Sequence, residues 1–340
     1  MNYSYIMGID AAAGKFDYHL MDRQETEICF AEVQLTGLNV QDWFTELCQQ
    51  LDCPTDGVLV CIENTGVYSI GVAYELHLAG VAVWLEDAFQ IKQSSGRVNS
   101  KTDRLDAMRI ARYALRNFAD YQSFVADTTV VVNLKSLDQQ RRRLMKAKNQ
   151  LTNAIKEERR YVPKDLRASE DNYADTEGVV SQIRAAIKAI DKKMAKLIRQ
   201  DERCKRINKV LTSLPGIGPV TSLKLILKTN LFAQGYDHRK IASYLGIAPH
   251  KKQSGKRLNA KPKTRKNVDG ATKGSLYMGM LRHLSSNNRI GHYYRRKIAE
   301  GKHHNSVVNA ISNIILQTAC ACLRKDELYV EKFAKNLQTS

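Results

Sequence analysis

Four carboxylate side chains in the first third of the chain could hold metal ions for phosphoryl chemistry. Asp10 and Glu63 each end an apolar run, so both follow expected buried strands. Asp103 and Asp106 are three residues apart in a segment of helical character, which places them on one helix face. Burying unpaired charge is costly, whereas hard Mg²⁺ takes carboxylate oxygens. Two such ions about 4 Å apart activate and stabilise the oxygens of a phosphodiester.

Each of these acids also has an ordinary structural explanation. An Asp at a strand end often caps the following turn, and an i,i+3 acid pair often only solvates a helix. The metal interpretation rests on the order of the set: strand and Asp, strand and Glu, then helical Asp-x-x-Asp.

A second group of residues able to do chemistry surrounds Ser254. This serine lies in an expected basic loop and precedes a glycine, which lets the backbone bend and the hydroxyl project. Lys251, Lys252, Lys256 and Arg257 flank it and could hold a scissile phosphate. A serine hydroxyl is a weak nucleophile until a base, a metal or a cationic setting activates it. Composition alone favours a plain turn here.

The first 118 residues are predicted to be α/β and to position the four acids. Short apolar runs alternate with amphipathic segments, and the small residues 11–14 form a turn open to phosphate or metal. We expect strands near 6–10, 16–21, 28–35, 58–63 and 81–85, and helices over 40–51, 67–79 and beyond 87.

Residues 128–205 are predicted to form an antiparallel helical hairpin. A heptad-like spacing of apolar residues runs from Ile183 to Leu197, and the helix expected over 133–158 has a similar spacing. Two interpretations stay equally open, an arm that packs only on its own chain and a coiled coil that joins subunits.

The remaining segment is strongly basic. Leu-Pro-Gly-Ile-Gly at 214–218 resembles the hairpin of helix-hairpin-helix modules, in which Gly216 and Gly218 would let backbone N–H groups reach phosphate; a plain Gly-Pro turn is the alternative. Residues 240–304 hold 16 Lys+Arg against two acids, which favours phosphate contact. An amphipathic helix over 306–324 is expected to pack on this region.

Charge is distributed unevenly along the 340 residues. The formal net charge is +18, yet residues 1–100 carry −10 and the remainder +28. Such a basic chain is expected to bind polyanions, and its acidic front suits a metal centre. The seven cysteines show neither a disulfide framework nor a zinc pattern, and no leader or apolar stretch near 18 residues is evident. We therefore expect buried thiols in a reducing cytosol.

These pieces together resemble one protein family. The chain is similar to the DEDD transposases of the bridge-RNA-guided insertion-sequence recombinases, relatives of the pilin-gene inversion recombinase. The matching segments occur in family order over about residues 6–320: Gly8-Ile9-Asp10, Ile62-Glu63-Asn64-Thr65-Gly66, Lys101 to Ala107, Leu214 to Pro219, and Tyr244-Leu245-Gly246 through Ser254-Gly255.

The resemblance implies a fold and a site. It implies an RNase H-like, resolvase-type domain over 1–125, a coiled-coil arm over 126–205, and a mainly helical transposase domain with a helix-hairpin-helix-like element over 206–340. Asp10, Glu63, Asp103 and Asp106 would bind Mg²⁺, as two ions that Mn²⁺ could replace. Ser254 would be the nucleophile. Nucleic-acid contacts are expected from Lys101, Arg104, Gly216, Gly218, Lys251, Lys252, Lys256 and Arg257.

The resemblance also implies a location, the bacterial cytoplasm and the nucleoid when the protein acts, and it implies partners. They are double-stranded donor and target DNA, a structured non-coding guide (bridge) RNA, and further copies of the chain, as dimers that assemble into a tetramer with composite sites. Two positions depart from the family pattern: Ala13 stands where a Lys is usual, with Lys15 two residues on, and Gln253 replaces a first serine before Ser254.

We therefore expect an RNA-guided, site-specific DNA recombinase that moves its own insertion sequence through a Mg²⁺-assisted covalent phosphoserine. The first alternative is a Holliday-junction resolvase-like endonuclease that uses metal-activated water, with a structural Ser254. The second is a nucleic-acid-binding protein without catalysis. A denaturant-stable protein–DNA adduct separates the first two, and Mg²⁺-dependent strand scission excludes the third.

Overall fold

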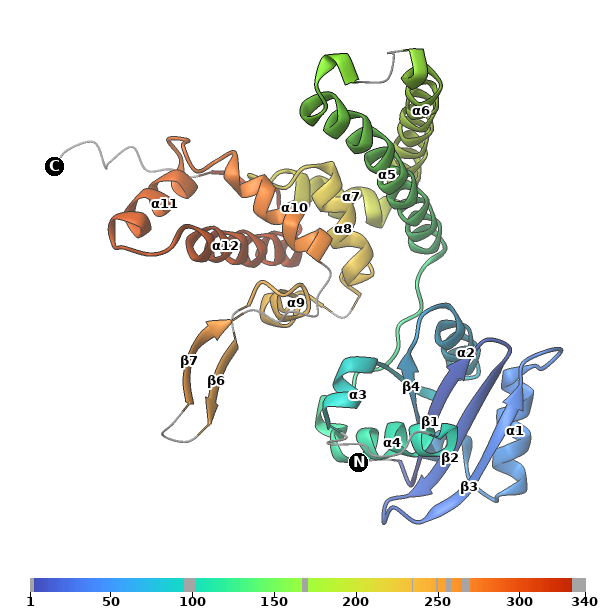
Figure 1. Cartoon of the computed structure of the whole chain (residues 1–340). Coiled ribbons are helices and arrows are strands. Elements are labelled where there is room, and N and C mark those ends of the chain that lie inside the picture. Colours follow the sequence, from blue (N-terminus) through green and yellow to red (C-terminus); the bar gives the residue numbers. More distant parts are fainter. Residues whose placement is uncertain are drawn as a thin grey trace. The chain divides into compact units, whose positions relative to one another are not determined.

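The computed structural model describes residues 3–94, 102–166, 171–233, 235–248, 250–254, 258–263 and 270–331, with backbone alone for Asp171 and for 250–263. The chain divides into two compact units, Met1–Ala126 and Asp127–Ser340 (Figure 1). The helical arm therefore belongs to the second unit, and the further boundary at 205 stays a prediction.

The first unit is built on a mixed five-stranded sheet in the order β3-β2-β1-β4-β5. β1, β2 and β3 form an antiparallel meander, and β4 and β5 run parallel to β1. The predicted strands are confirmed as β1 (Tyr5–Ala12), β2 (Lys15–Asp22), β3 (Glu27–Gln34), β4 (Val58–Asn64) and β5 (Ala82–Asp87).

Helices cover both faces of this sheet, which buries β1 and β4 between two cores. Alternate residues of each strand point to opposite faces, so Met7 and Ile9 enter one core and Ile6 the other. The first core contains residues of α1 (Val40–Gln50) and α2 (Val67–Leu78). The second contains residues of α3 (Ala88–Ser94) and α4 (Asp103–Arg116). Short 3-10 turns lie at Thr55–Gly57 and Phe118–Asp120.

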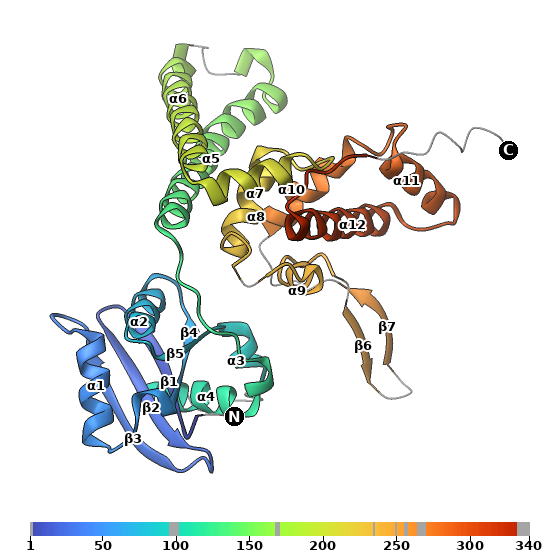
Figure 2. The same cartoon turned by 180° about the vertical axis from the view of Figure 1, so that it is seen from behind.

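The second unit begins with the predicted helical hairpin. It consists of α5 (Thr129–Tyr161) and α6 (Asp171–Gln200), with a 3-10 turn at Lys164–Leu166. Ile187, Ile190 and Met194 are buried along the seam, as the heptad spacing predicts. Both views show the hairpin extending from the helices that follow it (Figures 1 and 2).

Those helices pack around one core. It is filled by residues of every helix from α7 to α12, and the arm adds Val131, Leu134 and Met194. The helices are α7 (Glu202–Thr212), α8 (Pro219–Thr229), α9 (His238–Tyr244), α10 (Gly270–Leu281), α11 (Arg289–Ala299) and α12 (His304–Lys325).

Helix α12 corrects one expectation. By length and composition this helix could cross a membrane, so the expectation that no apolar stretch near 18 residues occurs is wrong. Half of that apolar stretch is buried within the unit, and Val308, Leu316 and Cys320 are fully buried. Composition of this kind is what the core helix of a helical unit requires.

The segment around Ser254 is also different from the expected loop. β6 (His250–Ser254) and β7 (Leu258–Lys263) form an antiparallel hairpin that projects from the helices next to α9 (Figures 1 and 2). Ser254 is the last residue of β6 and pairs with Leu258.

Candidate active site on the acidic sheet

Asp10 and Glu63 lie side by side on adjacent parallel strands. The printed register of β1 and β4 runs to Ile9 opposite Ile62, so Asp10 and Glu63 are the next residues along. Neighbouring strands are about 4.8 Å apart. Both side chains point to the face that carries α4, because they follow Gly8 and Cys61 by two residues. Both are half-buried.

The turn after Glu63 ties these two strand ends together. The Thr65 hydroxyl donates to the Ala11 carbonyl at 3.1 Å, so the end of β4 is held against the end of β1. Gly66 has φ 104° and ψ −129°, a conformation that glycine adopts without strain. The Glu-Asn-Thr-Gly segment therefore has a structural role, because it holds the strand ends that carry Asp10 and Glu63 together.

Helix α4 brings the other two acids to this face. A Cβ on Gly8 would come far closer than 3.0 Å to the backbone of Ala107 and Ala111, so α4 lies directly on β1. Thr102 caps the helix by accepting from the Leu105 N–H at 3.3 Å, and Asp103 and Asp106 form its first turn.

The chain's own cations hold both helical acids. Lys15 Nζ lies 3.5 Å from Asp103 Oδ2, and Arg109 Nη1 donates to Asp106 Oδ1 at 2.6 Å. The Asp103 side chain is 64% exposed and that of Asp106 is 18% exposed. The contact from Lys15, which is paired with Ala12, shows that the start of α4 lies over the end of β1.

Sequence reasoning missed three further acids, which form a row across the sheet together with Asp10 and Glu63. Glu32 pairs with Asp17, Asp17 with Asp10, and Glu63 with Glu86, so one acid from each strand lies across this face of the sheet. The alternation of polar and apolar residues over 15–20 is a signal that was available for Asp17. For Glu32 and Glu86 the signal is the strand register, which the sequence does not contain.

Burial and charge set the pKa values along this row. Burial raises the pKa of Asp17, whose exposure is 5%, and Lys15 at 3.8 Å opposes the shift. Burial also raises the pKa of Glu86, which accepts from the Tyr113 hydroxyl at 3.0 Å. Lys15 also binds Glu32, and that contact is the main reason why the lysine pKa is raised. Lys15 therefore stays charged among three carboxylates.

The donor set fits a hard divalent cation. Carboxylate oxygens are the ligands that Mg²⁺ takes, and the backbone puts Asp10, Glu63 and the first turn of α4 at one end of one sheet face. Within the described ranges, however, no three His, Cys, Asp or Glu side chains gather closely enough to share an ion. An ion that took Asp103 and Asp106 as ligands would compete with Lys15 and Arg109 for their oxygens.

Further cations along α4 bind the β2–β3 hairpin. Arg104 pairs with Glu27 and lies over the Phe30 ring at 5.5 Å. Arg112 and Arg116 contact Glu25 at 3.0 and 2.8 Å. Arg104 thus has a structural partner, and its expected nucleic-acid contact stays a prediction, while Lys101 lies outside the described residues.

The expected nucleophile and two of its four neighbouring cations lie on β6 of the second unit. The backbone of Lys251, Lys252 and Ser254 belongs to β6, and Lys256 and Arg257 lie outside the described residues. The site-residue assignments on this hairpin stay predictions.

The glycine turn between α7 and α8 has a packing role. Gly216 has φ 78°, and a Cβ there would collide with Met280, while a Cβ on Gly279 would collide with the Gly216 carbonyl. Gly218 is exposed at the start of α8. Its expected contact with phosphate remains open to test, whereas Gly216 is needed for close approach to α10.

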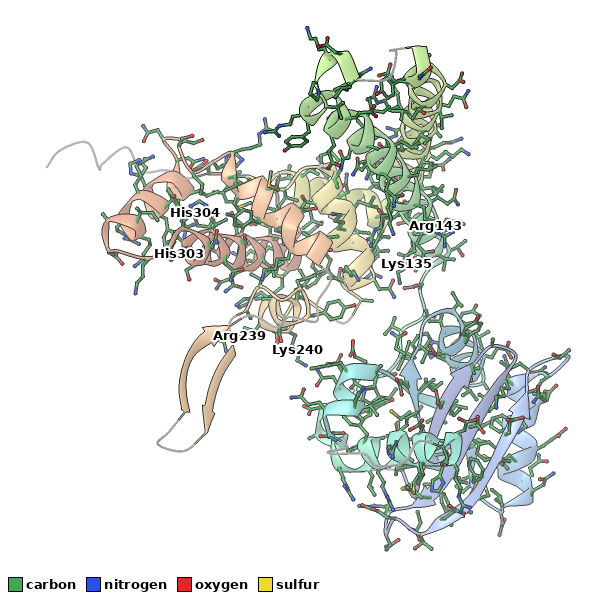
Figure 3. All side chains as sticks on the ribbon, in the orientation of Figure 1. Lys135, Arg143, Arg239, Lys240, His303 and His304 are labelled. Carbon is green, nitrogen blue, oxygen red and sulfur yellow. The ribbon has the colours of Figure 1, made fainter. Side chains whose placement is uncertain are left out.

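Basic side chains are spread over the second unit. Those labelled in Figure 3 come from α5 (Lys135 and Arg143) and α9 (Arg239 and Lys240). The ring of His304, which begins α12, lies between the hydroxyls of Tyr277 and Tyr294, at 3.1 and 2.8 Å. This histidine therefore links α10, α11 and α12.

Comparison with known proteins gives consistent results over most of the chain. Two family profiles match, one described as a DEDD transposase over residues 7–158 and one as a transposase of the IS116/IS110/IS902 family over residues 208–295. The pilin gene-inverting proteins of Moraxella bovis and Moraxella lacunata are each 22% identical over 334 residues, covering 96% of this chain and 97% of theirs.

Among solved structures, the chain is similar to RuvC of Thermus thermophilus. In complex with a Holliday junction substrate, that protein is 13% identical, with a TM-score of 0.28, and the match covers 36% of this chain and 100% of RuvC. A second RuvC structure is 15% identical with a TM-score of 0.27, and the match covers 35% of this chain and 99% of RuvC.

The expected architecture is confirmed in outline by the structure itself: a mixed-sheet amino-terminal unit is followed by a mostly helical remainder. Both family profiles describe transposases, and the full-length relatives are named for inverting a gene. The chain belongs to the IS110/IS116/IS902 family of DNA transposases.

Proposed function

We propose that this transposase is an RNA-guided recombinase that exchanges DNA strands through a covalent phosphoserine on Ser254. The observation that best supports the acidic half of the site is the convergence of Asp10, Glu63 and the first turn of α4 on one end of one sheet face. The support for Ser254 is its position at the end of a strand in the basic unit, within the second family match.

Divalent ions bound by these carboxylates would supply Lewis-acid stabilisation of charge on the phosphate oxygens. Asp10 and Glu63, fixed by the strand register, would hold the ions, and Asp103 and Asp106 would complete the ligand set from α4. Ser254 would come from a basic unit of the same or another copy.

In the proposed step, the Ser254 oxygen bonds to phosphorus and loses its proton. The bond from phosphorus to the leaving DNA oxygen breaks, and that oxygen gains a proton. The phosphoserine keeps the energy of the phosphodiester, so rejoining to another strand needs no nucleotide hydrolysis. The chain has no G-x-x-x-x-G-K-[ST] segment, in keeping with this scheme. The guide RNA and the tetramer are inferred from the family resemblance.

Two variants test the two halves separately. Ser254→Ala should abolish the denaturant-stable protein–DNA adduct, while Ser306→Ala, an exposed serine of the same unit, should leave it intact. Asp10→Asn should lower Mg²⁺-dependent strand cleavage by at least about 100-fold. Even the mutation of a residue that only hydrogen-bonds a metal ligand typically lowers metal affinity or activity 10- to 100-fold. Asp42→Asn, on the exposed first turn of α1, is its control.

Co-purified RNA should be retained by all four variants. Cleavage that persists in Ser254→Ala without an adduct would instead establish attack by water. Undiminished adduct formation by Ser254→Ala, or undiminished cleavage by Asp10→Asn, would refute the corresponding half of the proposal.

A further inference from the structure

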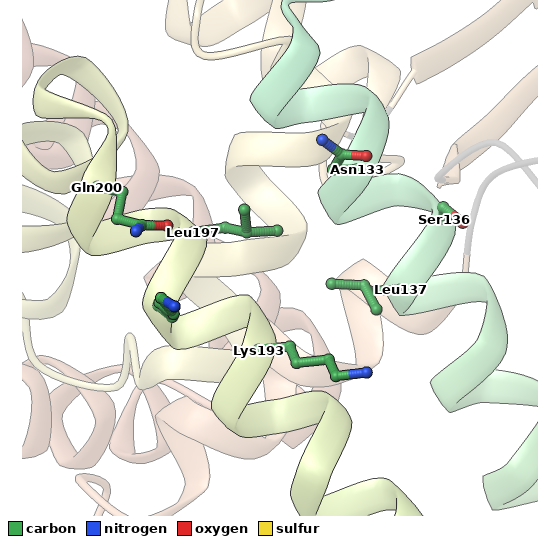
Figure 4. Close-up of a pocket in the computed structure, with 7 residues that line it drawn as sticks. Asn133, Ser136, Leu137, Lys193, Leu197 and Gln200 are labelled. Carbon is green, nitrogen blue, oxygen red and sulfur yellow. The ribbon is translucent and has the colours of Figure 1, made fainter.

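A polar hollow lies between the two helices of the arm, at the end next to α7 (Figure 4). Its volume is about 350 Å³. Lys193, Lys196 and Gln200 line it from α6, and Asn133 and Ser136 from α5. Leu137 and Leu197 give it an apolar floor. Every polar residue of the lining can donate a hydrogen bond, and none is a carboxylate.

The acidic side chains on neighbouring turns already have partners within the chain. Asp191 pairs with Arg141 at 2.7 Å, and buried Asp138 pairs with Arg142 at 2.7 Å. Asp127 binds Lys135 at 2.5 Å. Asp201 accepts from the Cys204 N–H at the start of α7.

Lys193 and Lys196 are therefore surplus positive charge. Both are exposed, and in the described part of the chain neither has an ion-pair partner. The two helices carry nine and six Lys+Arg against three and four Asp+Glu, so the field around the hollow is positive.

A second hollow on the same seam differs from the first in the charged residues that line it. It has a volume of about 420 Å³ and includes Lys156, Arg159 and Arg184, but also Glu177. Arg159 Nη1 lies 3.0 Å from Glu177 Oε1, and its guanidinium lies over the Tyr173 ring at 5.2 Å. In that hollow Glu177 neutralises one of three cations, whereas the lining of the first hollow includes no carboxylate.

We propose that the hollow of Lys193 and Lys196 binds the phosphodiester backbone of a nucleic acid. The two ammonium groups neutralise adjacent phosphates, Asn133, Ser136 and Gln200 donate to phosphate oxygens, and the leucine floor contacts sugar carbons. Such contacts position the nucleic acid without reading its bases. The arm would therefore hold the nucleic acid in place, and it would take part neither in catalysis nor in the choice of sequence. The inference does not depend on metal binding or on Ser254.

The test is the salt dependence of binding. Lys193→Gln/Lys196→Gln and the wild-type protein are titrated without divalent metal against a labelled duplex DNA of random sequence and a labelled RNA hairpin. For duplex DNA, each neutralised phosphate contributes about 0.9 to the slope of log K against log salt concentration. The double variant should therefore bind DNA with a slope that is shallower by about 1.8.

Lys188→Gln/Lys192→Gln is the control pair. At about 100° per residue these exposed lysines lie on the side of α6 opposite buried Ile190, and neither lines the hollow. The same charge is removed from the same helix, so a general field effect would shift both double variants equally. Circular dichroism and the thermal unfolding midpoint show whether each variant is folded.

The two probes identify the source of the phosphodiester. A shallower slope with DNA alone, with RNA alone or with both supports the proposal and assigns that nucleic acid. Slopes that match the control pair on both probes would overturn it. An unchanged slope together with a change in oligomeric state of the double variant would assign the hollow to an acidic segment of a second copy.

Discussion

The two units of this chain place their candidate chemistry on scaffolds of very different kinds. Asp10 and Glu63 lie near the ends of two adjacent strands inside a five-stranded sheet that is packed on both faces. Ser254 ends a strand of a two-stranded hairpin. A two-stranded hairpin alone is marginally stable in water. The acidic half is thus positioned by the core of its own unit, and the serine is expected to gain its final position from the substrate.

In each unit a glycine lets two backbone segments pack closely together. Substitutions at these glycines therefore test how the two units differ. In the first unit Gly8 admits α4 onto β1, and in the second Gly216 and Gly279 admit the glycine turn onto α10. The first of these contacts also sets the position of candidate ligands, whereas the second serves packing.

Gly8→Ala should have the largest effect. Its Cβ would collide with the backbone of Ala107 and Ala111, which cannot move without shifting α4. We expect a loss of at least about 3 kcal/mol in the free energy of unfolding of the first unit, measured with urea, and loss of cleavage with it.

Gly71→Ala in α2 is the matched control. Its Cβ would meet nothing within 4 Å, and alanine favours a helix interior, so a gain of about 0.5–1 kcal/mol is expected. Equal stability of Gly8→Ala and the wild-type protein would show that α4 is not seated on β1.

Lys15→Gln should have an intermediate effect, on metal affinity. Lys15 contacts Asp17, Glu32 and Asp103, so an ion that recruits Asp103 has to displace the ammonium group. Its raised pKa keeps the group charged at neutral pH. We expect the variant to bind Mg²⁺ or Mn²⁺ roughly two- to five-fold more tightly by calorimetry, as is usual for an exposed pair.

Lys92→Gln removes the same charge from an exposed position on α3 and is the control. Lys15→Arg should keep the wild-type affinity. Weaker metal binding by Lys15→Gln would mean that the lysine holds Asp103 in the ligating position instead of competing for it.

Glu25→Gln should have the smallest effect, and it depends on pH. The hydrogen bond from Arg116 is the main cause that lowers the pKa of Glu25 below its ordinary 4.5. A lowered pKa stabilises the fold above pH 4.5, and this stabilisation is lost as the pH falls through the folded-state value. The variant should lose less than about 1 kcal/mol at pH 7 and nothing in strong acid.

Urea unfolding over a pH series measures this, with exposed Glu46→Gln on α1 as the control. A deficit that is the same at every pH would show that packing, and not charge, is what Glu25 contributes.

The sequence was sufficient to predict the elements that carry the acids. Apolar runs that end in Asp10 and Glu63 gave the buried strands, and Asp103 and Asp106 were placed on one helix. The heptad spacing likewise gave the arm. These patterns are local, so one strand or one helix is enough to show them.

Features that depend on pairing could not be read in this way. That Glu32, Asp17 and Glu86 extend the acidic row follows from the strand register, and that Lys15 reaches Asp103 follows from the seating of α4. The packing role of Gly216 depends on Gly279, which is 63 positions away in the chain, and the phosphate contact expected of Gly216 stays a prediction. The strands of the β6–β7 hairpin lack apolar alternation, so the sequence predicts a loop there.

The place of α12 in the chain has a consequence for biosynthesis. Translation delivers the first 126 residues as a separate unit, so the acidic sheet can fold while the ribosome is still extending the chain. The hydrophobic core of the basic unit cannot be completed until residues 304–325 leave the ribosome, since α12 contributes nine buried side chains to that unit. Until then its apolar partners on α7 and α10 stay exposed to solvent, and a chain that stopped before α12 would have only its first unit completely folded.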